Sequence, residues 1–144
     1  MTSLAAIEAR IDAFATAPVT YREDAETLLR LAEEVLEYWL DANGKVPVTR
    51  KKEGFRLLAL HAQSAKGDPS FNACRETCRE IAYRYNLAMS VADVGELTRA
   101  VATMRRLVQH LSLFISGKCQ SAQLGEFCCA SRPLRQTDSE MLEN

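Results

Sequence analysis

The fold is decided by residues 93–117, DVGELTRAVATMRRLVQHLSLFISG, whose apolar side chains recur three and four residues apart. They are Val94, Leu97, Val101, Met104, Val108, Leu111 and Ile115. This spacing places them on one face of an α-helix. Three further apolar side chains flank and widen that face, at Ala100, Leu107 and Phe114. A wide face favours the core of a helical bundle over a two-stranded coiled coil.

The rest of the chain predicts further helices, most of them with a side chain that can cap the first turn. The expected helices cover about residues 3–15, 21–43, 50–65, 70–88 and 94–117, with caps at Thr2 or Ser3, Thr20, Thr49 and Asp93. The segment Lys66-Gly67-Asp68-Pro69 is expected to end the third helix and start the fourth. No segment alternates with period two for long enough to predict a strand. We therefore predict an all-α, single-domain bundle of four to five helices over residues 1–117. Residues 118–144 are expected to form a mobile, cysteine-containing tail, as a short helix or irregular.

Composition narrows the class of protein. The chain has 144 residues, 47% of them apolar and 26% charged, which suits one globular domain and excludes wholesale disorder. No apolar run reaches the ~18 residues that a membrane helix needs. Charged residues come too early at the N-terminus for a secretory signal peptide, so we expect a cytoplasmic protein without membrane contact.

Charge is distributed unevenly along the chain. Residues 1–48 carry nine acidic and four basic side chains, whereas residues 49–118 carry six acidic and twelve basic ones. The net charge of −1 is too low for a dedicated nucleic-acid-binding protein, so a nucleic-acid partner is not expected. The acidic and basic helices are expected to pair within the chain, or between two copies of it.

The five cysteines are the least ordinary feature of the sequence, at Cys74, Cys78, Cys119, Cys128 and Cys129. Cys74 and Cys78 are four residues apart, so both thiols project from one helix face. If the tail folds back, four thiolates could converge on zinc or an iron–sulfur cluster, with His61 as a further candidate ligand. However, the spacing matches no established zinc or cluster pattern, in which ligands two to four residues apart occur twice, in loops.

Two other interpretations of Cys74 and Cys78 remain open. They continue an apolar helix face with Phe71, Ile81, Ala82 and Tyr85, which is typical of core residues. They could also act as a reactive thiol pair, although no thiolate-stabilising charge pattern surrounds them. The core interpretation is favoured, so the cofactor is left unknown.

No signature of catalysis is present. The six glycines are scattered singly and form no phosphate-binding loop. Glu33, Glu34 and Glu37 lack the Glu-x-x-His pattern of carboxylate-bridged metal sites, so they are interpreted as a solvated face. A Cys78 nucleophile with His61 as its base has no supporting local motif. The sequence therefore leans against an enzyme.

Leu57 and Leu60 lie off the inner face of their predicted helix, while Leu31 and Tyr38 widen the face of the preceding one. A helix that is apolar on two sides is either central in a bundle or exposed at a partner surface. We predict the second case, a homodimer with Leu57 and Leu60 at the interface. The predicted function is a non-enzymatic helical protein–protein interaction module, such as a regulator, adaptor or accessory subunit. The alternative is a cysteine-ligated metal or iron–sulfur protein used in sensing or cofactor handling.

Overall fold

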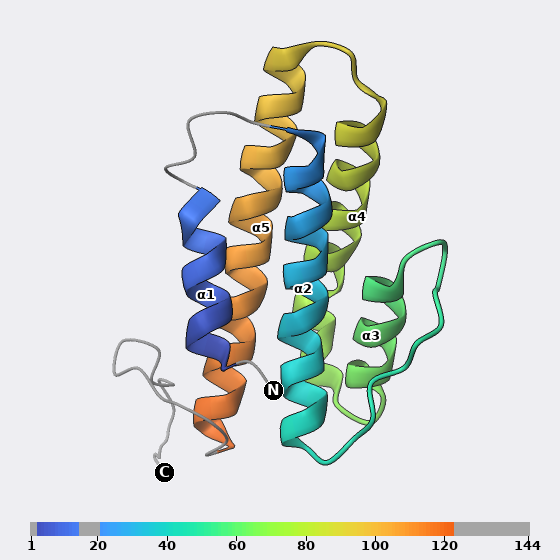
Figure 1. Cartoon of the computed structure of the whole chain (residues 1–144). Coiled ribbons are helices and arrows are strands. Elements are labelled where there is room, and N and C mark those ends of the chain that lie inside the picture. The colour runs from blue at the N-terminus through green and yellow to red at the C-terminus, as the bar shows by residue number, and fades with distance from the viewer. Residues whose placement is uncertain (1–2, 15–20, 123–144) are drawn as a thin grey trace.

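The protein is an all-α bundle in the computed structural model, which describes residues 3–14 and 21–122. Its elements are α1 (Leu4–Ala13), α2 (Arg22–Ala42), α3 (Arg56–Ala65), the short 3-10 helix η2 (Pro69–Cys74), α4 (Arg75–Ser90) and α5 (Val94–Ser121). The three long helices α2, α4 and α5 run alongside one another, and the two shorter helices α1 and α3 lie against them (Figure 1). The predicted all-α class is confirmed.

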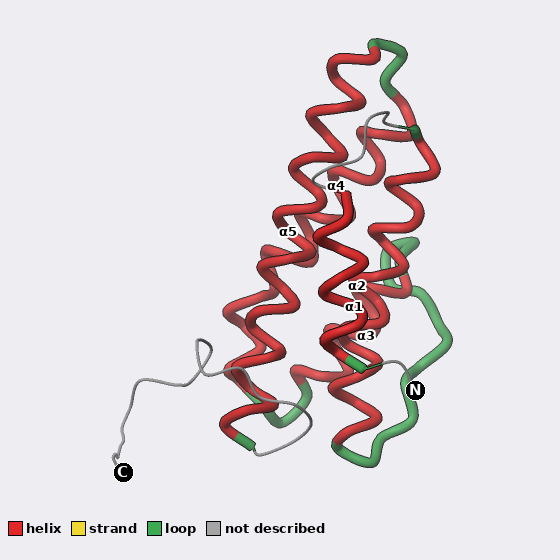
Figure 2. The backbone as a smooth tube through the Cα atoms, turned by 60° about the vertical axis from the view of Figure 1, so that its left-hand side comes forward, coloured by secondary structure: helices red, strands yellow, loops and turns green. Residues whose placement is uncertain are grey.

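Helix α2 occupies the centre of the bundle and packs against α1, α3, α4 and α5. A view turned by 60° shows the long helices still running in a common direction (Figure 2). Contact with four neighbours explains why α2 buries side chains around most of its circumference, including Leu31 and Tyr38 beside the predicted face. Within the part of the chain that the structure describes, no helix is long and apolar enough to cross a membrane.

Helix α5 confirms the predicted face and extends it. Its seven apolar residues spaced three and four apart are buried except Val94, which is 72% exposed on the first turn, and the flanking Leu107 and Phe114 are partly buried. The Asp93 carboxylate accepts a hydrogen bond from the Glu96 amide at 2.9 Å, as the capping prediction required. The prediction that Gly117 ends the helix is wrong, because the helix continues to Ser121. A single glycine costs only ~1 kcal/mol in a helix, and burial of the residues beyond it offsets that cost.

The third helix begins later than predicted, at Arg56 rather than after Thr49. Lys52 and Phe55 instead exchange backbone hydrogen bonds of 2.9 and 3.0 Å across a tight turn. Both central residues of this turn have positive φ, 54° at Glu53 and 88° at Gly54. Such a pair is incompatible with a continuing right-handed helix, so the helix starts only after the turn.

The interface prediction for Leu57 and Leu60 is wrong. Both side chains are 0% exposed within the single chain. The ten-residue helix α3 packs against α2, η2 and α4, so its neighbours surround more than one of its sides. The apolar residues outside its predicted face therefore mark a central helix, the other possibility for such a pattern.

Candidate functional site

A groove lies between the C-terminal part of α2, the start of η2 and the last turns of α5. We call it the α2–α5 groove; its volume is about 700 Å³ and its lining includes Trp39, Asp68, Leu113, Phe114, Gly117 and Lys118. Leu113 exposes 55% of its surface there. A Cβ added at Gly117 would meet no atom within 4 Å, so the α5 backbone is open to close approach at this point.

Lys118 closes one side of the groove and is held by several partners at once. Its Nζ lies 5.0 Å from the ring centroids of both Trp39 and Phe71, within the range of cation–π attraction. The same ammonium group pairs with Asp68 at 3.0 Å and donates to the Ser70 hydroxyl at 2.7 Å. Hydrogen bonds from Ser70, and then Lys118, lower the pKa of Asp68. The rim of the groove therefore carries a neutralised pair of charges.

Cys74 and Cys78 lie at the start of α4, close to His61 of α3. Both are buried, with 1% and 0% of their surfaces exposed. Cys74 is the N-cap residue of α4, at the point where the 3-10 helix ends. The Nε2 atom of His61 lies 2.8 Å from the carbonyl oxygen of Phe71, and the Cys74 thiol donates to the same oxygen at 3.4 Å. One carbonyl group thus holds the imidazole and the thiol together.

The two thiols differ in acidity. A hydrogen bond between them lowers the pKa of Cys74 and raises that of Cys78, and burial raises the pKa of Cys78 further. His61 lowers the pKa of Cys74 as well, by hydrogen bonding and by its charge. Burial alone lowers the pKa of His61, but its hydrogen bonds with Cys74 and with the Phe71 carbonyl outweigh burial and leave it raised. Cys74 is therefore the thiol that ionises first, beside a protonatable imidazole.

The alternative of a cysteine-ligated metal site gains no support from the described part of the chain. Within residues 3–14 and 21–122, no group of three or more His, Cys, Asp or Glu side chains is placed to hold a metal ion. Cys119 is buried in α5, and burial raises its pKa to about 11, which disfavours the thiolate that a metal requires. Cys128 and Cys129 lie outside the described residues, so their role as ligands stays a prediction.

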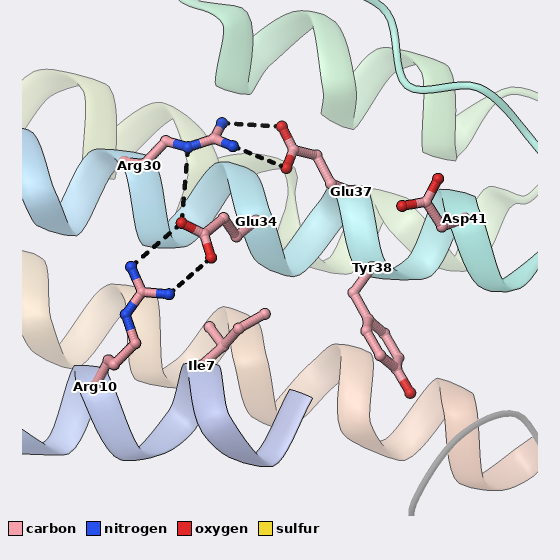
Figure 3. A pocket seen from close by; sticks show the side chains of 7 residues that line it. All are labelled: Ile7, Arg10, Arg30, Glu34, Glu37, Tyr38 and Asp41. Atoms are coloured by element: carbon pink, nitrogen blue, oxygen red, sulfur yellow. Dashed lines mark hydrogen bonds and ion pairs between the residues drawn. The ribbon is translucent and has the colours of Figure 1, made fainter. Parts of the chain in front are cut away.

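A charged cluster occupies a separate pocket of about 520 Å³ between α1 and α2 (Figure 3). Arg10 donates to Glu34 at 2.9 Å, and Arg30 donates to Glu37 at 2.9 Å. The prediction of a solvated glutamate face is wrong, since the side chains of Glu33, Glu34 and Glu37 are only 13%, 17% and 18% exposed. Their carboxylates are paired with arginines that tie α2 to its neighbours, which indicates a stabilising role.

Glu37 is the centre of this cluster, because it also pairs with Arg56 of α3. The acidic segment 1–48 and the basic segment 49–118 therefore form an ion pair within one chain at this position. Replacing Glu37 with alanine is expected to lower the free energy of unfolding by ~1 kcal/mol, since the partly buried Arg56 and the exposed Arg30 both lose a partner. Urea denaturation followed by circular dichroism measures the change.

The matched control is Glu80→Ala. Glu80 pairs with Arg84 one turn away, and its side chain is 42% exposed, so this change is expected to cost less than ~0.5 kcal/mol. Equal losses in the two variants would show that the cluster around Glu37 adds nothing beyond ordinary surface pairs.

Comparisons of the chain with protein families, with curated proteins and with solved structures find no match. The residues of the α2–α5 groove were not predicted as a site from the sequence. A signal for Leu113 does exist, since it is a large apolar residue off the predicted face of an otherwise well-phased helix. The sequence pattern predicts a helix end at Gly117, whereas this residue lies within α5 and lines the groove.

Proposed function

We propose that this protein is a non-enzymatic helical interaction module that forms a homodimer through the α2–α5 groove. The observation that carries the proposal is the position of Leu113, a 55% exposed leucine directly beside a groove that Trp39 and Phe114 line. Large exposed apolar side chains next to an aromatic hollow are typical of protein-binding surfaces.

The groove and its leucine favour a second copy of the chain as the occupant. In a two-fold symmetric dimer the same patch serves both subunits, so each Leu113 can enter the hollow of the partner copy. The open side of Gly117 allows the two α5 helices to approach closely. The Asp68–Lys118 pair is neutral within one chain, so two such rims do not repel each other.

In this proposal the protein is cytoplasmic, and its dimer binds a further protein. The dimer acts there as a regulator, adaptor or accessory subunit. The three described cysteines, Cys74, Cys78 and Cys119, are free thiols, which suits a reducing compartment. Self-association is tested with this protein alone, so the test does not require the further partner.

Replacing Leu113 with glutamate is expected to convert the dimer to a monomer, with an increase in the dissociation constant of about 100-fold or more. The physical reason is that a charge would have to be buried where an apolar side chain was, which costs several kcal/mol. Analytical ultracentrifugation over a concentration series measures the shift. Circular dichroism is expected to remain unchanged, because Leu113 is exposed in the single chain.

Val94→Glu is the matched control, on the same helix and 72% exposed but outside the groove. It is expected to leave the dimer intact. A wild-type protein that stays monomeric at high micromolar concentration would rule out self-association. Equal weakening by both variants would place the interface elsewhere on α5.

A further inference from the structure

The buried pair Cys74 and Cys78 has no role in the proposed interface, yet its surroundings are those of a reactive dithiol. The two thiols lie four residues apart at the start of α4, both are buried, and each perturbs the pKa of the other. A disulfide bond between them requires the sulfurs to close to ~2.05 Å. In a regular helix, residues four apart hold their side chains parallel and too far apart for this bond. Cys74 escapes that restriction because it is the N-cap residue, with φ −107° and ψ 8°, outside regular helical geometry.

Three features stabilise a thiolate at Cys74. The hydrogen bond from Cys78 and the contact with His61 favour the ionised form. Cys74 is also the N-cap residue of the 16-residue helix α4; its side chain makes no capping hydrogen bond, but the helix dipole favours negative charge at this end. Cys78 keeps its proton, because its hydrogen bond with Cys74, and then burial, raise its pKa. The pair therefore consists of one nucleophilic sulfur and one protonated sulfur.

A pocket of about 310 Å³ lies next to His61 and to the chain neighbours of Cys74, although neither thiol lines it. Its lining includes His61 together with Asn72 and Arg75, which lie on either side of Cys74 in the chain, and also Arg79. It is large enough for a small peroxide or a short organic hydroperoxide, and its arginines would stabilise an oxyanion that forms during reaction. The 3-10 helix η2, which carries Asn72, has weaker hydrogen-bond geometry than an α-helix and so can open locally.

We propose that Cys74 and Cys78 form a peroxide-reactive dithiol that a hydroperoxide converts to a reversible Cys74–Cys78 disulfide. The Cys74 thiolate attacks one peroxide oxygen, the O–O bond breaks, and the departing alkoxide or hydroxide takes a proton from His61. Cys74 is then a sulfenic acid. The Cys78 sulfur attacks the Cys74 sulfur, the S–O bond breaks, and water leaves with the proton of the Cys78 thiol. The two thiols supply the two electrons that reduce the peroxide. A soluble dithiol later reduces the disulfide by thiol–disulfide exchange and regenerates both thiols.

The test follows the disulfide directly in the full chain by mass spectrometry. Trypsin cleaves after Lys66, Arg75 and Arg79, so Cys74 falls in peptide 67–75 and Cys78 in peptide 76–79. Treatment of the reduced protein with equimolar hydrogen peroxide at pH 7 is expected to link these two peptides. Dithiothreitol is expected to separate them again. The linkage should form at least about tenfold faster in the folded protein than in urea, where an ordinary thiol is only ~3% ionised at pH 7.

Two variants separate the roles of the sulfurs. Cys78→Ala removes the resolving thiol, so peroxide is expected to leave a sulfenic acid on peptide 67–75, which dimedone captures. Cys119→Ala is the matched control, because Cys119 is equally buried but its pKa is raised to about 11; this variant should form the 74–78 link at an unchanged rate.

Three results would overturn the proposal. In the first, another cysteine is oxidised faster than Cys74. In the second, the Cys74–Cys78 link forms no faster in the folded protein than in urea. In the third, the main product is a disulfide from Cys74 or Cys78 to a third cysteine. Each is read from the wild-type chain, so it does not depend on how well the variants fold. None of them bears on the dimer, whose test uses Leu113.

Discussion

Replacing Leu57 with glutamate is expected to unfold the protein rather than to separate two copies of it. Leu57 is 0% exposed and lies in α3, which packs against α2, η2 and α4. A carboxylate at this position has to be buried without a partner or has to force α3 away from the bundle. Either outcome is expected to cost more than ~4 kcal/mol, against a total stability of roughly 5–15 kcal/mol for a domain.

Far-ultraviolet circular dichroism and the midpoint of urea denaturation measure this effect. The matched control is Leu113→Glu, the same substitution at a leucine that is 55% exposed, which should retain the helical signal. If Leu57→Glu instead kept full helicity and changed only the molecular mass, Leu57 would lie at an interface between copies, as the sequence pattern suggested.

Helix positions were largely predictable from the sequence because local rules determine them. The apolar period and the Asp93 cap located α5, and its buried residues follow the predicted face from Leu97 to Ile115. The start of α3 was missed because the turn at Glu53 and Gly54 requires positive φ at a non-glycine residue, which is uncommon. Gly54 was the available signal for that turn.

The surroundings of α3 could not be predicted, because they depend on how many helices enclose it. A ten-residue helix with apolar residues on two sides fits both a buried position and an exposed sticky surface. The sequence pattern gives the direction of each side chain around the helix axis. It does not give the number of neighbours in those directions, which decides between the two cases for Leu57 and Leu60.

The candidate sites were predictable only in part, for a similar reason. Cys74 and Cys78 were recognised as a pair from their spacing, and His61 as a side chain that could reach them. Which thiol ionises first depends on the N-cap position and on hydrogen bonds that form only in the folded chain. The α2–α5 groove combines α2, η2 and α5, which are distant in sequence, so no local pattern marks it.

Phe71 connects the groove with the thiol pair, and its replacement by alanine is the second change expected to have a large effect. Its ring is 0% exposed and lies 5.6 Å from the ring of Trp39 and 5.5 Å from that of Phe114, between centroids. Its backbone carbonyl accepts the hydrogen bonds of His61 and Cys74. Removing a fully buried phenyl ring is expected to lower the free energy of unfolding by ~3–5 kcal/mol.

Phe71→Leu is the matched control, because leucine fills much of the same space and is expected to cost less than ~1.5 kcal/mol. Urea denaturation measures both losses. The alanine variant leaves a cavity under η2, so that segment should open more often and the oxidation of Cys74 by peroxide should accelerate relative to the leucine variant. Equal stability of the two variants would contradict the placement of the Phe71 ring in the core. Because η2 carries both the ring and Cys74, the same cavity that weakens the fold should expose the thiolate.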